Sequence, residues 1–233
     1  IPSLDLSFGG EGDGGEYHSI YDSYDHFVRF KDPGFVYGIT LAKVAGRVTL
    51  RLANAELLPF DFKGFYRTVN DYLTDVSKVL DDQRERREIN NELIKEKHYT
   101  YAADPKEKYF PPVAKENVPY LNFSNLQNAL AVLQKEAEVY SSLVGIAASD
   151  LPVLSINQLN KILYQAEQKL TYGPGLPQRP WFRHTIYAPG FYTGYGVKTL
   201  PGIREAIEQN KWKEAQEQIE IVARAIDNYT QEV

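Results

Sequence analysis

Residues 62–79 read FKGFYRTVNDYLTDVSKV, and the pattern of this stretch indicates the fold class. Large apolar and aromatic side chains recur in it every three or four residues for about five turns, which is the spacing of one face of an α-helix. They are Phe62, Phe65, Val69, Tyr72, Val76 and Val79. A long helix with one apolar face predicts a mostly α-helical domain in which that face packs against other helices.

Three later stretches carry comparable patterns. Ser124 with Gln127 and Ser155 with Gln158 resemble capping boxes that open helices, and Pro201 suits the first turn of another. We therefore expect four substantial helices in residues 60–233, packed like a four-helix bundle. The charged run at 84–88 is either a solvated extension of the first helix or a bent second piece. Residues 171–200 are rich in Gly, Pro and aromatic residues and predict a non-helical segment.

Residues 1–59 have a different character. Residues 1–8, IPSLDLSF, alternate as a strand does, and residues 9–15, GGEGDGG, read as a loop. Residues 35–54 predict a helix that is apolar over much of its circumference, and therefore buried on several sides. This first part predicts the last strand and helices of an α/β domain, whose sheet would need further strands.

The composition limits the classes of function that the protein can have. The 233 residues carry a net charge of −5 with dispersed basic residues, which gives no electrostatic reason to expect nucleic-acid binding. No apolar run approaches the roughly 20 residues of a membrane span. The absence of cysteine excludes disulfides and thiol chemistry. The compartment stays open.

His18 is the strongest candidate for chemistry. It follows the glycine-rich loop and a tyrosine, Tyr17, and it precedes an expected helix start at Ser19 with Asp22. A flexible approach to a helix start is a place where a metal ligand can be presented. The loop acids could also reach a metal, although such acids are more often solvated. The remaining histidines predict structural roles: His26, His98 and His184. The sequence contains no HExxH motif and no phosphate-binding loop.

Six motifs carry a resemblance to a known family. In order they are YHSIYDSY at 17–24, FKDP at 30–33, LAN at 52–54, LPFD at 58–61, RPWFRHTIYAP at 179–189 and LPGI at 200–203. Together they resemble the C-terminal part of the glutamate carboxypeptidase II and transferrin receptor group within the M28 zinc peptidases. The last two resemble the dimerisation domain of that group, and the similarity covers essentially the whole chain.

The resemblance implies an exopeptidase with two zinc ions per chain, a peptide substrate and a homodimer. In that family a glutamate acts as general base for a zinc-bound water. The histidine of the Tyr-His motif is the last zinc ligand and corresponds to His18. The tyrosine before it, which corresponds to Tyr17, holds the tetrahedral intermediate through its hydroxyl. The other ligands and the base lie upstream in the family, so this chain by itself is expected to be inactive.

The resemblance also assigns a substrate-binding loop. Residues 192–196, YTGYG, match the loop that the helical domain lends to the substrate pocket. Tyr195 matches the tyrosine of the loop, whereas Gly194 stands where glutamate-selective members have lysine. Their arginine cluster would fall near Asp5 and Ser7 and is missing. These departures favour a broader exopeptidase specificity, with Tyr195 contacting a substrate carboxylate or simply packing.

Two other interpretations compete with the peptidase. A non-catalytic, receptor-like or scaffold dimerisation module would need neither His18 nor Tyr17. An independent helical bundle without a ligand would not explain why residues 1–17 resemble the edge of an α/β sheet.

Overall fold

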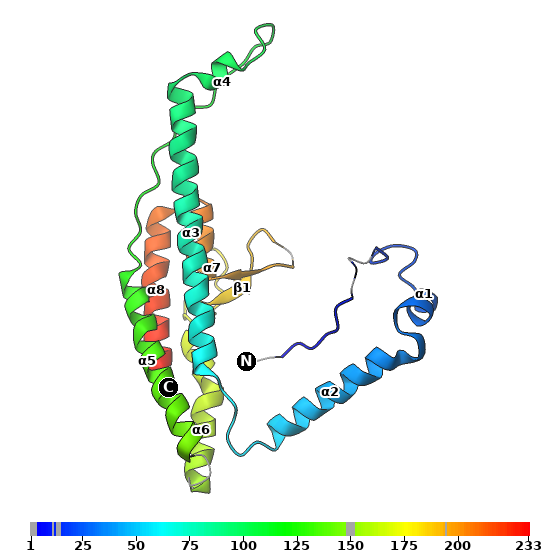
Figure 1. Ribbon diagram of the computed structural model, residues 1–233. Coiled ribbons are helices and arrows are strands. Elements are labelled where there is room, and N and C mark those ends of the chain that lie inside the picture. Colours follow the sequence, from blue (N-terminus) through cyan, green and yellow to red (C-terminus); the bar gives the residue numbers. More distant parts are fainter. Residues whose placement is uncertain (1–3, 11, 13–14, 148–151, 194) are drawn as a thin grey trace. The chain divides into compact units, whose positions relative to one another are not determined.

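The computed structural model describes residues 4–10, 12, 15–147, 152–193 and 195–233, and most of them are helical (Figure 1). The mostly α-helical fold class is therefore confirmed. The chain divides into two compact units: unit 1 contains Ile1–Phe60 with Pro152–Tyr164, and unit 2 contains Asp61–Leu151 with Gln165–Val233. The predicted division into domains of residues 1–59 and 60–233 stays a prediction, and in the structure residues 152–164 group with the first unit.

Unit 1 is built from short helical turns and two longer helices. A buried aspartate, Asp32, ends the first turns and caps the next helix, because its two carboxylate oxygens accept hydrogen bonds from Tyr37 N at 2.9 Å and Gly38 N at 2.8 Å. Asn160 of the second longer helix bonds Glu56 O through its Nδ2 at 2.7 Å. The elements are α1 (Tyr24–His26), the π-helix η1 (Phe27–Lys31), the 3₁₀-helix η2 (Pro33–Phe35), α2 (Val36–Ala53) and α6 (Val153–Ala166).

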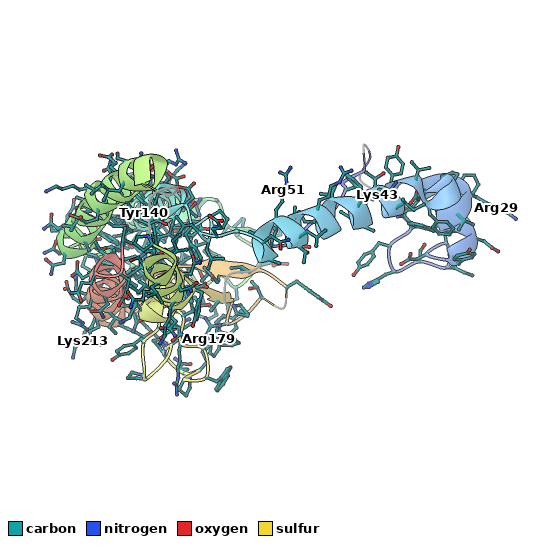
Figure 2. The ribbon with its side chains drawn as sticks, turned by 90° about the horizontal axis from the view of Figure 1, so that it is seen from below. Arg29, Lys43, Arg51, Tyr140, Arg179 and Lys213 are labelled. Carbon is teal, nitrogen blue, oxygen red and sulfur yellow. The ribbon has the colours of Figure 1, made fainter. Side chains whose placement is uncertain are left out.

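Three expectations for unit 1 were wrong. Residues 4–8 form no strand, since none of the described residues pairs with them and an isolated strand leaves its backbone groups unbonded. The helix start is Ser23 rather than Ser19: the Ser23 side chain accepts a bond from His26 N, whereas Ser19 closes a turn. Helix α2 forms as expected, but none of its residues is buried. The side chains along this part, including Arg29, Lys43 and Arg51, are drawn in Figure 2.

Unit 2 buries the apolar face that residues 62–79 predict. The core positions of α3 (Phe62–Lys95) are Phe62, Val69, Leu73, Val76 and Leu80. Phe65, Tyr72 and Val79 are half-buried at the margin of this face. The Phe62 ring meets the Tyr140 ring edge-on at 4.8 Å, and Tyr140 lies among the helices of this unit (Figure 2).

The other elements of unit 2 complete one core. Helix α8 packs against α5, α7 and η3, and α3 packs against α5 and α7. The apolar face of α8 is buried: Ala215, Ile219, Val222 and Ile226 are at most 1% exposed. The elements are α4 (His98–Tyr101), α5 (Ser124–Ala147), the 3₁₀-helix η3 (Glu167–Leu170), β1 (Tyr187–Pro189), β2 (Val197–Thr199), α7 (Pro201–Glu208) and α8 (Trp212–Thr230).

The charged run at 84–88 is a straight continuation of α3, so no bent second piece exists. Side chains of this run and of the next turn bind the chain segment that returns from the end of the helix. Arg87 Nη1 donates to Glu116 O at 2.8 Å, and Asn91 Nδ2 donates to Lys115 O at 2.7 Å. Arg84 donates to Pro119 O at 3.1 Å. The charges therefore satisfy the carbonyl groups of a segment that has no secondary structure of its own.

Helix α5 begins at Ser124, as predicted, and the Asn122 side chain accepts a bond from Ser124 N at 2.9 Å. The predicted start at Ser155 is wrong, because α6 begins at Val153 and Ser155 lies inside it. Pro201 does open α7. The described residues of 171–200 form no helix, as predicted, and they contain the antiparallel strand pair β1–β2. Among the described helices, none combines the length and the apolar character that crossing a membrane requires.

Candidate functional site

A tight turn in unit 1 carries Tyr17 and His18. The carbonyl oxygen of Glu16 accepts bonds from Ser19 N at 2.8 Å and from Ser19 Oγ at 2.6 Å, and the Glu16 carboxylate pairs with Lys31. Between these anchors His18 has φ of 61°, a left-handed conformation that few residues other than glycine adopt. Strained backbone of this kind is found more often at functional sites than elsewhere.

The turn exposes both side chains. The rings of Tyr17 and His18 stack with centroids 3.9 Å apart and planes at 21°, and Tyr17 is 74% exposed. An accessible imidazole is a suitable zinc ligand, and a phenol hydroxyl beside it can donate a hydrogen bond to a bound group. The donor chemistry of His18 therefore fits zinc. Within the described ranges, no three His, Cys, Asp or Glu side chains lie close enough to hold a metal ion together.

The candidate substrate loop lies in unit 2, between β1 and β2. The strands pair antiparallel with Tyr187 opposite Thr199 and Pro189 opposite Val197, and Gly190 N donates to Gly196 O at 3.0 Å to close the loop. Tyr195 is 100% exposed, so it packs against nothing in the described part of the chain. Gly194 lies outside the described residues. Tyr17 and His18 are thus brought together, whereas Tyr195 belongs to the other unit.

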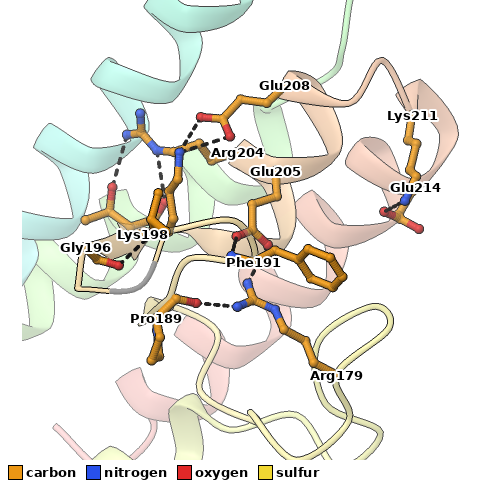
Figure 3. A network of polar contacts seen from close by, with 12 residues as sticks. Arg179, Pro189, Phe191, Gly196, Lys198, Arg204, Glu205, Glu208, Lys211 and Glu214 are labelled. Atoms are coloured by element: carbon orange, nitrogen blue, oxygen red, sulfur yellow. Dashed lines mark hydrogen bonds and ion pairs between the residues drawn. The ribbon is translucent and has the colours of Figure 1, made fainter.

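A buried ion pair that no sequence pattern predicts lies beneath this loop. Arg179 and Glu205 are 3% and 9% exposed, and Arg179 Nη2 donates to Glu205 Oε2 at 2.5 Å (Figure 3). Arg179 Nη1 donates to Pro189 O, and Glu205 Oε1 accepts from Phe191 N at 2.7 Å. The two residues are 26 positions apart, so no local pattern relates them. Taken singly, each residue is only slightly unusual in the sequence. Arg179 is a charge inside an aromatic motif, and Glu205 is a charge on an apolar helix face.

An open hollow of about 340 Å³ adjoins the loop. Two cations contribute to its lining, Lys198 and Arg204. Lys198 Nζ pairs with the Glu208 carboxylate at 2.7 Å, and Arg204 Nη2 donates to Thr199 Oγ1 at 3.0 Å (Figure 3). These contacts join β2 to α7.

His184 has the structural role that the sequence predicts. Its Nδ1 accepts a hydrogen bond from Ile186 N at 3.2 Å, and its ring stacks on Tyr187 at 4.1 Å. Burial lowers the pKa of His184, and the Glu167 carboxylate partly opposes this effect. Burial also raises the pKa of Tyr187, to about 12, together with the hydrogen bond that its hydroxyl donates to Glu167. A neutral His184 at physiological pH fits a residue that holds the start of β1.

Comparisons with known proteins find several that this chain resembles. Residues 121–233 match the family of the transferrin receptor-like dimerisation domain. The chain is 30% identical over 237 residues to the probable glutamate carboxypeptidase LAMP1 of Arabidopsis thaliana, which covers 97% of this chain and 28% of that protein. It is 32% identical over 231 residues to a probable glutamate carboxypeptidase of Arthroderma benhamiae, covering 97% of the chain and 27% of that protein.

A further relative has a different activity in its name. The aminopeptidase NAALADL1 of Mus musculus is 24% identical over 220 residues, covering 91% of the chain and 25% of that protein. The chain thus spans about a quarter of the length of these relatives. Over nearly its whole length the chain is similar to proteins named as glutamate carboxypeptidases, and residues 121–233 match the transferrin receptor-like dimerisation domain.

Proposed function

We propose that this chain is part of a zinc-dependent exopeptidase of the M28 type, which hydrolyses peptides with a metal-activated water. The observation that carries the proposal is similarity over 97% of the chain to proteins named as glutamate carboxypeptidases. The exposed His18, stacked on Tyr17, supports it, because a non-catalytic scaffold would need neither side chain.

The chain would supply three parts of the enzyme. The imidazole of His18 would be one zinc ligand, and the Tyr17 hydroxyl would donate a hydrogen bond to the substrate oxygen on which negative charge develops. The loop at 190–196 would form part of the pocket wall through Tyr195. Zinc, when bound, would act as a Lewis acid and lower the pKa of water. Completing the site needs ligands and a general base from beyond the described residues.

The direct test is peptide hydrolysis by the natural full-length protein, before and after zinc removal. We expect a panel of dipeptides to be cleaved, dialysis against a chelator to abolish cleavage, and added zinc to restore it. We expect neutral as well as acidic terminal residues to be accepted, since Gly194 replaces the carboxylate-binding lysine. A protein that cleaves nothing with zinc present would instead support the receptor-like module, an alternative favoured by the match of residues 121–233 to a dimerisation domain.

We also propose a homodimer formed through residues 121–233. Exposed apolar residues on α5, namely Val132, Val139 and Leu143 at 50%, 46% and 60%, offer part of the surface. A stable homodimer buries roughly 2,000 Å² or more, so it should persist at micromolar concentration. Light scattering after size exclusion should give twice the chain mass, and Val139→Glu should shift it toward one chain mass. Ser141→Glu is the control, because Ser141 is exposed and lies half a turn around the same helix from Val132. A wild-type mass of one chain would contradict the dimer.

A further inference from the structure

The buried pair Arg179–Glu205 joins three segments of unit 2. Arg179 lies in the turn before β1 and Glu205 lies on α7, and their side chains meet beneath the loop at 190–196 (Figure 3). The Arg179 guanidinium also lies 5.6 Å from the ring centroids of both Phe182 and Phe191. Two aromatic rings and a carboxylate therefore fix the direction of the guanidinium.

Both partners bind the loop where it leaves β1. Arg179 Nη1 donates to the carbonyl of Pro189, and the second carboxylate oxygen of Glu205 accepts from Phe191 N at 2.7 Å. Gly190 stands between these two anchors, and its N–H closes the loop onto Gly196 O. The backbone on either side of Gly190 is thus held by charge-assisted bonds, which are about twice as strong as neutral ones.

The stability of the fold alone does not explain why these two charges are buried. Removing two ions from water costs several kcal/mol per ion, and apolar residues often stabilise a fold as well or better. The pair is used here to fix backbone atoms rather than to fill space, because it bonds one carbonyl and one amide of the same loop. A loop fixed at its base presents its outer residues in one direction.

We infer that Arg179 and Glu205 are positioning residues that hold the loop so that Tyr195 meets the peptide substrate. The inference rests on the proposed function, since it needs Tyr195 to contact substrate. The pair touches no substrate itself and acts through the loop.

The kinetic test uses the natural full-length protein with Glu205→Gln, Tyr195→Phe and the double variant. The amide of Gln keeps the shape of Glu205, but it can accept only one of the two bonds that the carboxylate accepts. We expect each single change to raise KM about tenfold with kcat nearly unchanged, the mark of lost binding common to ground and transition states. Because both substitutions act on the same contact with substrate, KM of the double variant should also rise about tenfold, rather than hundredfold.

A second readout measures the loop itself. Hydrogen exchange of the peptide spanning 189–197 should be about tenfold faster in Glu205→Gln than in wild type. Glu214→Gln is the matched control: Glu214 pairs with Lys211 at 3.7 Å on α8 and makes none of the loop contacts described above. It should leave both KM and exchange at wild-type values.

The outcomes separate the two proposals. Unchanged exchange in Glu205→Gln overturns the anchoring, and KM effects that multiply in the double variant overturn the route through Tyr195. Wild-type protein that cleaves no peptide overturns the proposed function together with the substrate part of this inference. Faster exchange would in that case still support the anchoring of the loop.

Discussion

A His18→Ala variant of the natural full-length protein should hydrolyse peptides at least about 10³-fold more slowly than wild type, because a metal contributes several kcal/mol of transition-state stabilisation. The zinc content per chain should fall in parallel, as measured by elemental analysis. Both effects follow if the exposed imidazole in the turn at Glu16–Ser19 is a zinc ligand. Stoichiometric zinc in the variant would contradict that role.

The left-handed backbone at His18 calls for a second variant. Alanine is strained at φ of 61°, so His18→Ala alone could act by distorting the turn. Asparagine tolerates this conformation and has no imidazole, so His18→Asn should keep the turn and still lose zinc. His98→Ala is the control, since His98 is an exposed residue paired with Glu96 at 2.8 Å. It should retain both zinc and activity.

The sequence predicted what depends on local spacing. Phe62, Val69 and Val76 are core residues of α3 because an apolar residue every three or four positions is sufficient to define a helix face. Tyr17 and His18 could be proposed as candidate residues from the sequence because they are adjacent in a short motif, and they stay a prediction. The capping role of Asp32 could not be predicted, because its side chain accepts bonds from residues five and six positions ahead, beyond the usual N-cap spacing.

What the sequence missed depends on partners distant in the chain. Arg179 and Glu205 meet only after β1 and α7 have packed, so neither charge stands out in a linear reading. The same reason explains two wrong expectations for unit 1. The alternation at residues 4–8 and the apolar surface of α2 show that other elements could cover these segments, but the sequence does not show whether they do. Burial is a property of the neighbours of a segment as much as of its own residues.

Gly175→Ala should be the most destabilising small change in the segment that carries Arg179. Gly175 has φ of +77°, and a Cβ there would lie 2.2 Å from the carbonyl oxygen of Pro180 and 2.6 Å from its Cα. The obstacle is backbone, which cannot rotate away as a side chain can. Left-handed strain of about 1–2 kcal/mol and overpacking of about 1–3 kcal/mol together predict a loss of roughly 2–5 kcal/mol.

The backbone around Gly175 has little freedom to relieve that clash. Gly175 N donates to Tyr172 O at 3.0 Å, and the next residue, Leu176, is 5% exposed and donates from its N to Phe182 O at 2.8 Å. Moving Pro180 would also displace its neighbour Arg179 from Glu205. Gly175→Ala should therefore weaken the anchoring of the loop at 190–196 as well as the stability of unit 2.

Tryptophan fluorescence reports the thermal unfolding of unit 2, which contains Gly175. The two tryptophans of the 233-residue chain, Trp181 and Trp212, both lie in unit 2. At about 2–4 °C per kcal/mol, their thermal transition should fall by roughly 4–20 °C in Gly175→Ala. Gly173→Ala is the matched control, since a Cβ there meets no atom within 4 Å, and it should change stability by less than about 0.5 kcal/mol. Equal transitions in the two variants would mean that the turn at Gly175 yields to a side chain, and that Arg179 is held by its ion pair rather than by the backbone before it.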